Sequence, residues 1–219
     1  MERNNFRIAI DGPSGAGKST IAKLLAKKLG IEYVDTGAMY RAIALKLIRT
    51  GTDYKDEKAL ETMLAGTKVS FSGGHVTLDG EDVEGFIRTP EISALASPSS
   101  AVPMIRAKLV ALQRAMGDEK SLVMDGRDIG TNVFVDAEYK FFLTASSEVR
   151  AKRRFKELEE KGTPQPYEEV LKDMEQRDYQ DSHRALNPLT KAEDALEIDS
   201  SDMTVDEVLT SMLKVIESK

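Results

Sequence analysis

The decapeptide DGPSGAGKST, residues 11–20, carries the clearest chemistry in this sequence. Gly12, Gly17, Lys18 and Ser19 match the spacing of a glycine-rich loop that holds phosphate groups. Glycines let the backbone wrap phosphate oxygens, and the amide N–H groups at the start of a helix then point inward. The lysine reaches the β- and γ-phosphates, and the serine hydroxyl can bind Mg²⁺. The predicted triphosphate contacts are Gly12, Pro13, Ser14, Gly15, Ala16, Gly17, Lys18, Ser19 and Thr20, with Ser19 as the metal ligand.

The segments on both sides of this loop make a chance match improbable. From average residue frequencies, the pattern arises by chance in a chain of this length about once in a hundred times or less. FRIAID before the loop is typical of a strand, and residues 19–29 after it have the apolar stripe of a helix. This strand, loop and helix order is the context that a phosphate loop requires.

Two further segments place charges where an anion can bind. YVDTGAMYR puts Asp35 at a strand end, Thr36 at a helix cap position and Arg41 in the second turn, although an ordinary capped helix with a solvated arginine explains it equally well. LVMDGRDIGT puts Asp125, Arg127 and Asp128 just past the carboxyl end of a strand, where open α/β sheets hold ligands. There Asp125 can orient Mg²⁺ or its water, and Arg127 can hold a transferring phosphoryl group.

Two helices add arginines at helical spacing. Arg150, Arg153 and Arg154 form one basic face, and the helix that carries them ends at Gly162 before a second helix begins at about Tyr167. This hairpin resembles a lid. On the second helix, Arg177, Asp181 and Arg184 share a face. An exposed ion-pair ladder has the same spacing, so these residues alone do not decide between a site and a solvated surface.

The bulk composition bounds the class of protein. The chain has 219 residues, 41% of them hydrophobic, and this is enough for a full core. It has no cysteine, and no leader-like or membrane-length apolar run is visible, so the expectation is a cytoplasmic protein. The net charge of −6 argues against nucleic acid and membrane partners. No heptad or long apolar edge is visible, so a monomer is expected.

The elements around these residues alternate between strand and helix. Strands are predicted at residues 6–11, 31–35, 121–125, 138–145 and 195–199, with helices at 19–29, 36–51 and 204–219. This order predicts an α/β fold with a parallel sheet core of the P-loop NTPase type, flanked by helices. From residue 66 to 89 the pattern changes to alternation, with turns at Gly73-Gly74 and Asp79-Gly80, which predicts a small antiparallel β insertion.

Six segments in this order resemble the bacterial cytidylate kinase family along essentially the whole chain: DGPSGAGKST, YVDTGAMYR, IRTPEIS, ASPSSAVPMIR, MDGRDIGT and RDYQDSHR. The family consists of ATP:CMP phosphotransferases of the nucleoside monophosphate kinase group. It has a P-loop core, an NMP-binding region enlarged by a β insertion, and a mobile lid. By resemblance, we expect the core at residues 1–65, 102–149 and 185–219, the insertion at 66–101, and the lid with a substrate-binding helix at 150–184.

The resemblance also implies roles for individual residues. The CMP phosphate is held by Thr36, Arg41 and Arg127, and cytosine is faced by Ser97, Arg106 and Asp128. The ribose is met by Arg177 and Asp181, with Arg184 toward the phosphates. Arg154 is the lid residue that reaches ATP, although Arg150 and Arg153 compete for this role. The catalytic set is Lys18, Asp125, Arg127 and Arg184.

The expected activity is therefore Mg²⁺-dependent transfer of the ATP γ-phosphoryl group to CMP and dCMP. Two alternatives remain at this stage. One is a phosphate-loop kinase for another small acceptor, and the other is a nucleotide-binding regulatory module without turnover. The first has no need of the GRD and RDYQDSHR groups around a second phosphate. The second has no need of Lys18, Ser19, Asp125 and the arginines together.

Overall fold

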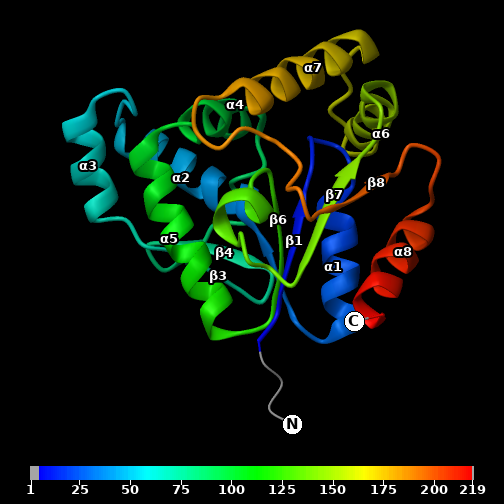
Figure 1. Ribbon diagram of the computed structural model, residues 1–219. Coiled ribbons are helices and arrows are strands. Elements are labelled where there is room, and N and C mark those ends of the chain that lie inside the picture. The colour runs from blue at the N-terminus through cyan, green and yellow to red at the C-terminus, as the bar shows by residue number, and fades with distance from the viewer. Residues whose placement is uncertain (1–4, 219) are drawn as a thin grey trace. The chain divides into compact units, whose positions relative to one another are not determined.

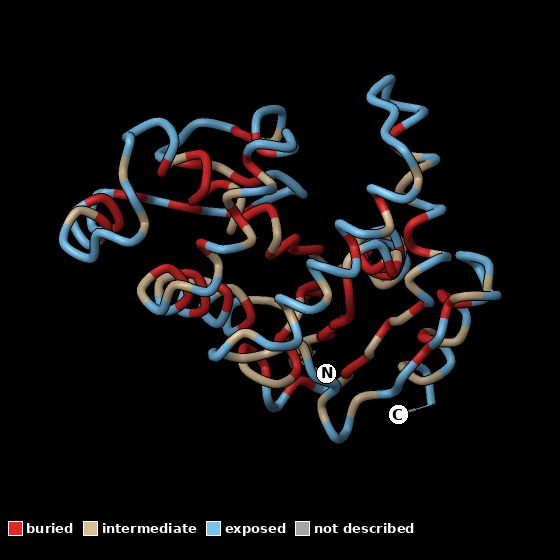
Figure 2. Tube along the Cα trace, turned by 90° about the horizontal axis from the view of Figure 1, so that it is seen from above, coloured by how far each residue is buried: buried red, intermediate tan, exposed pale blue. Residues whose placement is uncertain are grey.

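Residues 5–218 are described by a computed structural model, and they fall into two compact units. The first unit is Glu32–Leu122 with Asn5, and the second is Phe6–Ile31 together with the chain from Val123 on. Each unit has its own buried residues. In Figure 2 these follow the strands and the inner faces of the helices, while the outer faces are exposed.

The second unit contains a parallel sheet with the strand order β6-β1-β7-β8. Ile10 of β1 pairs with Phe141 of β7, and Leu143 of β7 pairs with Ile198 of β8. The central strands are apolar and buried on both faces, as strands of a parallel sheet covered by helices must be. The strands are β1 (Arg7–Asp11), β6 (Leu122–Gly126), β7 (Tyr139–Thr144) and β8 (Leu196–Asp199).

Two pairs of helices accompany this sheet. Helices α1 (Lys18–Leu29) and α8 (Val205–Glu217) pack side by side, as Figure 1 shows, and a capping box of Thr204 and Glu207 starts α8. Helices α6 (Ser147–Glu160) and α7 (Tyr167–His183) form a hairpin around a small apolar core. The residues of this core are Ala151, Leu158, Val170 and Met174. Between β6 and β7 the chain forms a short π-helix, η1 (Ile129–Val133).

The first unit combines helices with the β insertion. Its antiparallel sheet has the order β3-β4-β5, with the predicted turns at Gly73-Gly74 and Asp79-Gly80. Asp79 and Gly80 both have positive φ, at 53° and 89°, as the tight hairpin turn requires. The elements are β2 (Glu32–Asp35), α2 (Thr36–Thr50), α3 (Glu57–Ala65), β3 (Val69–Ser72), β4 (His75–Leu78), β5 (Glu81–Asp82), α4 (Pro90–Ser99) and α5 (Pro103–Glu119).

The predicted fold class is confirmed, with differences at particular residues. Helices α3, α4 and α5 and the π-helix η1 had no counterpart in the sequence analysis. Thr36 is not a cap but the first residue of α2, because the side chain of Asp35 caps the helix by accepting from the N–H of Ala38 at 2.9 Å. Arg184 lies just beyond α7 in an extended conformation, and so it does not share a helical face with Arg177 and Asp181 as predicted. The three-part division of the chain stays a prediction.

Within residues 5–218, no helix combines the length and the apolar character that a bilayer crossing demands.

The close packing at Gly12 leads to a prediction about stability. A Cβ atom at Gly12 would lie 1.9 Å from the carbonyl oxygen of Leu143, whereas one at Gly17 meets nothing within 4 Å. Both glycines have positive φ, so alanine is strained at either position, but only Gly12→Ala also forces two backbones apart. We expect Gly12→Ala to lower the free energy of unfolding by about 1 to 3 kcal/mol more than Gly17→Ala does, measured by urea unfolding. Equal losses would contradict this packing.

Candidate active site

The phosphate loop connects β1 to α1, and neighbouring elements hold its backbone in place. Gly12 lies against the carbonyl group of Leu143 in β7. Gly15 faces α6 and α7, because a Cβ atom there would lie 2.5 Å from the Cε atom of Met174 and 3.2 Å from the Cβ atom of Arg150. Gly17 is the N-cap of α1 and has no side chain to cover the helix start. A helix N-terminus with this opening favours an anion.

Lys18 lies inside the loop that it belongs to. Its side chain is buried, and its Nζ atom donates to the carbonyl oxygen of Pro13 at 2.7 Å. Burial and the positive charge of Arg127 lower the pKa of Lys18 from 10.5 to about 7, while Asp125, Asp181 and Asp11 act in the opposite direction. Burial disfavours the charged form of Lys18, so an anion that enters the loop stabilises this form.

Ser19 and Asp125 provide the oxygen atoms that a magnesium ion requires. Ser19 is the second residue of α1, and Asp125 lies in β6. The Ser19 hydroxyl donates to the Asp125 Oδ2 atom at 3.0 Å. Asp125 is buried. Mg²⁺ is bound in proteins through one or two hard oxygen ligands together with substrate phosphates, so this pair fits the ion. Ser19 and Asp125 would hold it, and their predicted roles stay predictions.

Two guanidinium–carboxylate pairs connect the turn after β6 to α7 and the residues that follow it. The Nε atom of Arg127 donates to Asp181 at 2.7 Å, and Arg184 donates to the Oδ1 atom of Asp128 at 3.0 Å. Burial lowers the pKa of Arg127, but attraction to Asp181 outweighs it, and the net pKa is raised. The second pair is the more deeply buried, with side chains 9% and 7% exposed. The tertiary structure thus brings the predicted site residues Arg127 and Asp128 into contact with Asp181 and Arg184, which lie more than fifty positions away in the sequence.

The three lid arginines have different surroundings, although the sequence analysis could not separate them. Arg150 is buried and donates to the carbonyl oxygens of Ala145 and of Ser14 in the phosphate loop. Arg153 donates to Ser200. Arg154 is half-buried and forms an ion pair with Glu157 at 2.9 Å.

Arg150 and Arg153 therefore bond to other segments of the protein, while Arg154 pairs with a residue of its own helix. Arg153 is the exposed member of the three, and Arg154 is half-buried. Arg177 is also exposed on α7.

In the first unit, a second group of charges surrounds the start of α2. Asp35 accepts from Arg41 and from Arg88, each at 3.2 Å, as well as from the N–H of Ala38. Burial raises the pKa of Asp35, but the charge of Arg41, the Ala38 N–H and the charge of Arg88 outweigh it and lower the pKa. Thr36 follows directly and is buried. This helix start with two guanidinium groups can bind an anion.

The two predicted cytosine contacts of the first unit lie on α4 and α5. Arg106 is buried in α5, donates to the carbonyl oxygen of Ser100 at 3.2 Å and lies 5.7 Å from the ring centroid of Tyr40. Since Tyr40 precedes Arg41 in α2, Arg106 is connected to the same helix as the anion-binding group. Ser97 is half-buried on α4.

Three residues around these groups were missed in the sequence analysis. Arg88 lies inside the segment IRTPEIS but received no role, and its partner Asp35 is 53 positions away. Asp11 was quoted as the first letter of the loop, yet its contacts lie in the turn after β6. Arg150 was treated only as a lid residue, although it contacts the phosphate loop. No local spacing signal shows such contacts.

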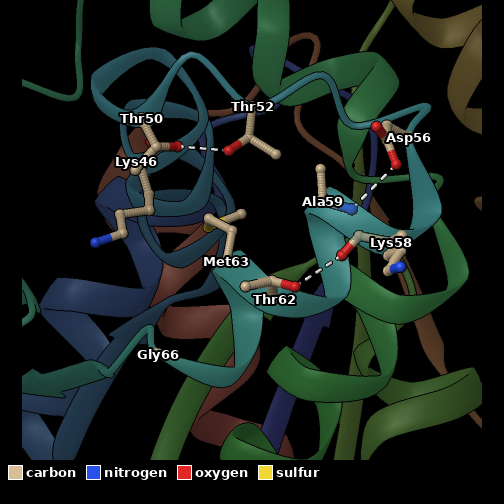
Figure 3. Close-up of a pocket in the computed structure, with 9 residues that line it drawn as sticks. All are labelled: Lys46, Thr50, Thr52, Asp56, Lys58, Ala59, Thr62, Met63 and Gly66. Carbon is tan, nitrogen blue, oxygen red and sulfur yellow. Dashed lines mark hydrogen bonds between the residues drawn. The ribbon is translucent and has the colours of Figure 1, made fainter.

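A surface cleft of about 680 Å³ lies elsewhere in the first unit, beside α2 and α3 (Figure 3). Its hydroxyl groups bond locally, Thr50 to Thr52 at 2.8 Å and Thr62 to the carbonyl oxygen of Lys58 at 3.0 Å. None of the residues that line it is a predicted site residue. The residues are Lys46, Thr50, Thr52, Asp56, Lys58, Ala59, Thr62, Met63 and Gly66.

Known proteins resemble this chain along its length. The family model described as cytidylate kinase matches residues 8–218. A cytidylate kinase of Caldanaerobacter subterraneus subsp. tengcongensis is 51% identical over 210 residues, which cover 96% of this chain and 94% of that protein. A cytidylate kinase of Lactobacillus johnsonii is 48% identical over 218 residues, or 98% and 95% of the two chains. The crystal structure of an uncharacterized protein from Eubacterium ventriosum is similar in fold, with a TM-score of 0.54 at 17% identity and coverage of 99% and 100%.

The parallel sheet, the glycine-rich loop before α1 and the Lys18, Ser19 and Asp125 set define a phosphate-loop protein of the kinase type. The family model that matches residues 8–218, and the relatives at 51% and 48% sequence identity, identify the family within this class. This chain belongs to the cytidylate kinase family.

The low pKa of Lys18 leads to a prediction that needs no nucleotide. The pKa is about 7 in the folded chain against an ordinary 10.5, so the unfolded chain binds more protons between these pH values and stability rises with pH across them. Lys18→Met removes this dependence. The unfolding free energy of the wild type minus that of the variant should therefore increase from pH 7 to 10, by up to about 1.4 kcal/mol per pH unit. A difference that stays flat would show that Lys18 titrates normally.

The buried Arg184–Asp128 pair leads to a second prediction. Arg184→Met leaves the buried carboxylate of Asp128 without its guanidinium partner, which should cost about 3 kcal/mol in urea unfolding without nucleotide. The control is Lys191→Met, because the Lys191–Glu197 pair has the same 2.8 to 3.0 Å geometry but lies exposed. That variant should lose no more than about 1 kcal/mol. Similar losses in both would contradict the burial of the first pair.

Proposed function

We propose that this chain transfers the γ-phosphoryl group of ATP to CMP, and to dCMP, giving ADP and the nucleoside diphosphate. The observation that carries the proposal is membership of the cytidylate kinase family along residues 8–218. The chain then acts in pyrimidine nucleotide metabolism. A monomer in the cytoplasm stays the expectation.

On the donor side, the phosphate loop holds the ATP phosphates. The loop backbone and the start of α1 surround the phosphate oxygens, and Lys18 places its ammonium group on the transferring phosphoryl group. The carbonyl oxygen of Pro13, 2.7 Å from the Lys18 Nζ atom, positions this group before ATP binds. Arg154 on α6 reaches ATP when the lid closes. Its pairing with Glu157 of the same helix supports this role, because Arg150 and Arg153 bond to other segments of the chain.

The metal ion in this proposal is Mg²⁺, held by Ser19 and oriented by Asp125 directly or through water. When bound, it neutralises charge on the β- and γ-phosphate oxygens. The 3.0 Å contact between the Ser19 and Asp125 oxygen atoms supports this assignment. The two residues keep their oxygens together in the absence of the ion.

On the acceptor side, the residues divide by the part of CMP that each binds. Phosphoryl transfer passes through a loose transition state, so alignment and neutralisation of charge matter more than a general base. Arg127 and Arg184 carry the neutralising charge in the second unit. The phosphate contacts are Thr36, Arg41 and Arg127, the base contacts are Ser97, Arg106 and Asp128, and the ribose contacts are Arg177 and Asp181.

A coupled assay with a panel of acceptors tests the proposal. With ATP and Mg²⁺, the purified chain should phosphorylate CMP and dCMP well, UMP and AMP poorly, and shikimate not at all. Lys18→Ala is the control, because its loss of turnover shows that the loop and not a contaminant carries the activity. Preference for AMP or shikimate would reject the assignment to CMP, and no turnover with any acceptor would favour a binding module.

Asp128 leads to a prediction about the accepted base. An ionised carboxylate only accepts hydrogen bonds, which suits the N4 amine of cytosine and opposes the O4 carbonyl of uracil. The Oδ1 atom of Asp128 accepts from Arg184 and the Oδ2 atom accepts from Asn132, and a carboxylate oxygen can accept more than one hydrogen bond. We expect the wild type to prefer CMP over UMP by about tenfold to a hundredfold in kcat/KM, since an unpaired buried polar group costs about 1 to 3 kcal/mol.

Asp128→Asn should reduce this preference, because an amide can turn its NH₂ group toward O4. Measurement of kcat/KM for CMP and UMP in both proteins checks this. An unchanged ratio would mean that Asp128 does not contact the base.

A further inference from the structure

Asp11 is a buried carboxylate at the junction of β1 and the phosphate loop, and the proposed function gives it no role. It is 4% exposed. Its Oδ1 atom accepts from the N–H of Ile129 at 2.8 Å, and its Oδ2 atom accepts from the N–H of Gly130 at 2.7 Å. Ile129 and Gly130 are the first two residues of η1 and follow Arg127 and Asp128 directly. One side chain thus connects two segments that are 118 positions apart.

The two N–H groups have no partner within their own helix. The first N–H groups of any helix lack an intrahelical acceptor, and no side-chain bond from the N-cap residue, Asp128, meets them. Asp11, at the end of β1, caps η1 in place of the N-cap side chain. The Asp128 side chain therefore stays directed to Arg184 and Asn132.

Both ends of this connection are rigid. Directly after Asp11, Gly12 lies so close to Leu143 that no side chain fits there. At the other end, a Cβ atom on Gly130 would lie 3.2 Å from the Cδ atom of Lys140 and 3.4 Å from the Asp11 carboxylate. An added methyl group there would require Lys140 to shift. A displacement of η1 would therefore be transmitted to the turn, and not absorbed by slack around Asp11.

We propose that Asp11 is a positioning residue, whose two hydrogen bonds hold the Arg127–Asp128 turn at a fixed place relative to the phosphate loop and Lys18. The inference rests on the proposed function, in which Asp128 and Arg127 bind the acceptor. A two-oxygen acceptor with both oxygens engaged fixes the orientation of the turn as well as its distance. Transfer between two bound nucleotides depends on such alignment.

Residue 11 is a carboxylate although its burial disfavours the charged form. Burial raises the pKa of Asp11 to about 6, with the Ile129 and Gly130 N–H groups and Lys18 acting in the opposite direction and Asp128 in the same one. Asn has a single acceptor oxygen at the same size, and its NH₂ group would face one of the two N–H donors. The two bonds thus require Asp rather than its isostere.

The test is Asp11→Asn, assayed with CMP, UMP and ATP varied in turn. We expect the KM for CMP to rise about tenfold, which is the effect of one lost charge-assisted bond, and the CMP:UMP ratio of kcat/KM to fall. The KM for ATP should stay within about twofold. Hydrogen exchange should show lost protection of the amides of Ile129 and Gly130.

The matched control is Thr204→Ala, which removes the capping box of α8 in the same unit without touching the turn. A merely structural Asp11 would behave like this control, with a lower Tm and with CMP and ATP constants changed alike. That outcome, or unchanged kinetics, overturns the inference. Activity of the wild type with CMP is established in the same assay, so a failure of the proposed function is seen separately.

A second variant keeps the inference testable if Asp11→Asn fails to fold. Gly130→Ala crowds the same turn from the other side, because its Cβ atom would lie 3.2 Å from the Cδ atom of Lys140 and in contact with the Asp11 carboxylate at 3.4 Å. It should raise the KM for CMP and lower the CMP:UMP ratio in the same way. Equal effects on CMP and ATP in this variant would also overturn the inference.

Discussion

Burial of charge at the ends of β1 and β6 is the constraint on which the second unit depends. Lys18, Asp11 and Asp125 are all buried there, and a buried charge is tolerated only where an opposite charge or several hydrogen bonds meet it. The carboxylates meet donors: Asp11 meets two backbone N–H groups, and Asp125 meets a hydroxyl. Lys18 has a carbonyl oxygen as its partner and retains the lowered pKa. Because a neutral carbonyl oxygen compensates the charge of Lys18 only in part, a polyanion that enters the site stabilises it.

The same constraint explains why α7 belongs to the site. Arg127 and Asp128 leave β6 together with opposite charges, and α7 and the residue after it supply the complementary pair, Asp181 and Arg184. Arg150 adds a third connection, from α6 to Asp178 of α7 and to the carbonyl oxygen of Ser14. Ion pairs therefore hold the helical hairpin to the turn after β6, and a hydrogen bond from Arg150 holds it to the phosphate loop. A bound phosphate group can compete for these arginines.

The start of α2 follows the same logic within the first unit. Asp35 caps the helix and also binds two guanidinium groups, so that Arg41 and Arg88 are held near an N-terminus that already favours anions. The carboxylate holds both arginines in position at the start of the helix. Arg106, buried in α5, lies 5.7 Å from the ring centroid of Tyr40 in α2 and adds a third guanidinium group beside that helix.

Local chemistry in the sequence was enough to predict the loop, the alternating elements and the β insertion. Glycine spacing, apolar periodicity and turn residues act over a few positions, and the loop residues Gly12, Lys18 and Ser19 follow one another closely in the sequence. Ser97 and Arg106 entered the predicted site through the family resemblance alone. The sequence could not show that Asp35, and not Thr36, caps α2, because both types cap helices well. Only tertiary structure decided which charges meet. The Arg127–Asp181, Arg184–Asp128 and Asp11–Gly130 contacts join positions 54, 56 and 119 apart, and such pairing is set by which strands and helices share a buried space. Periodicity carries no information over that distance.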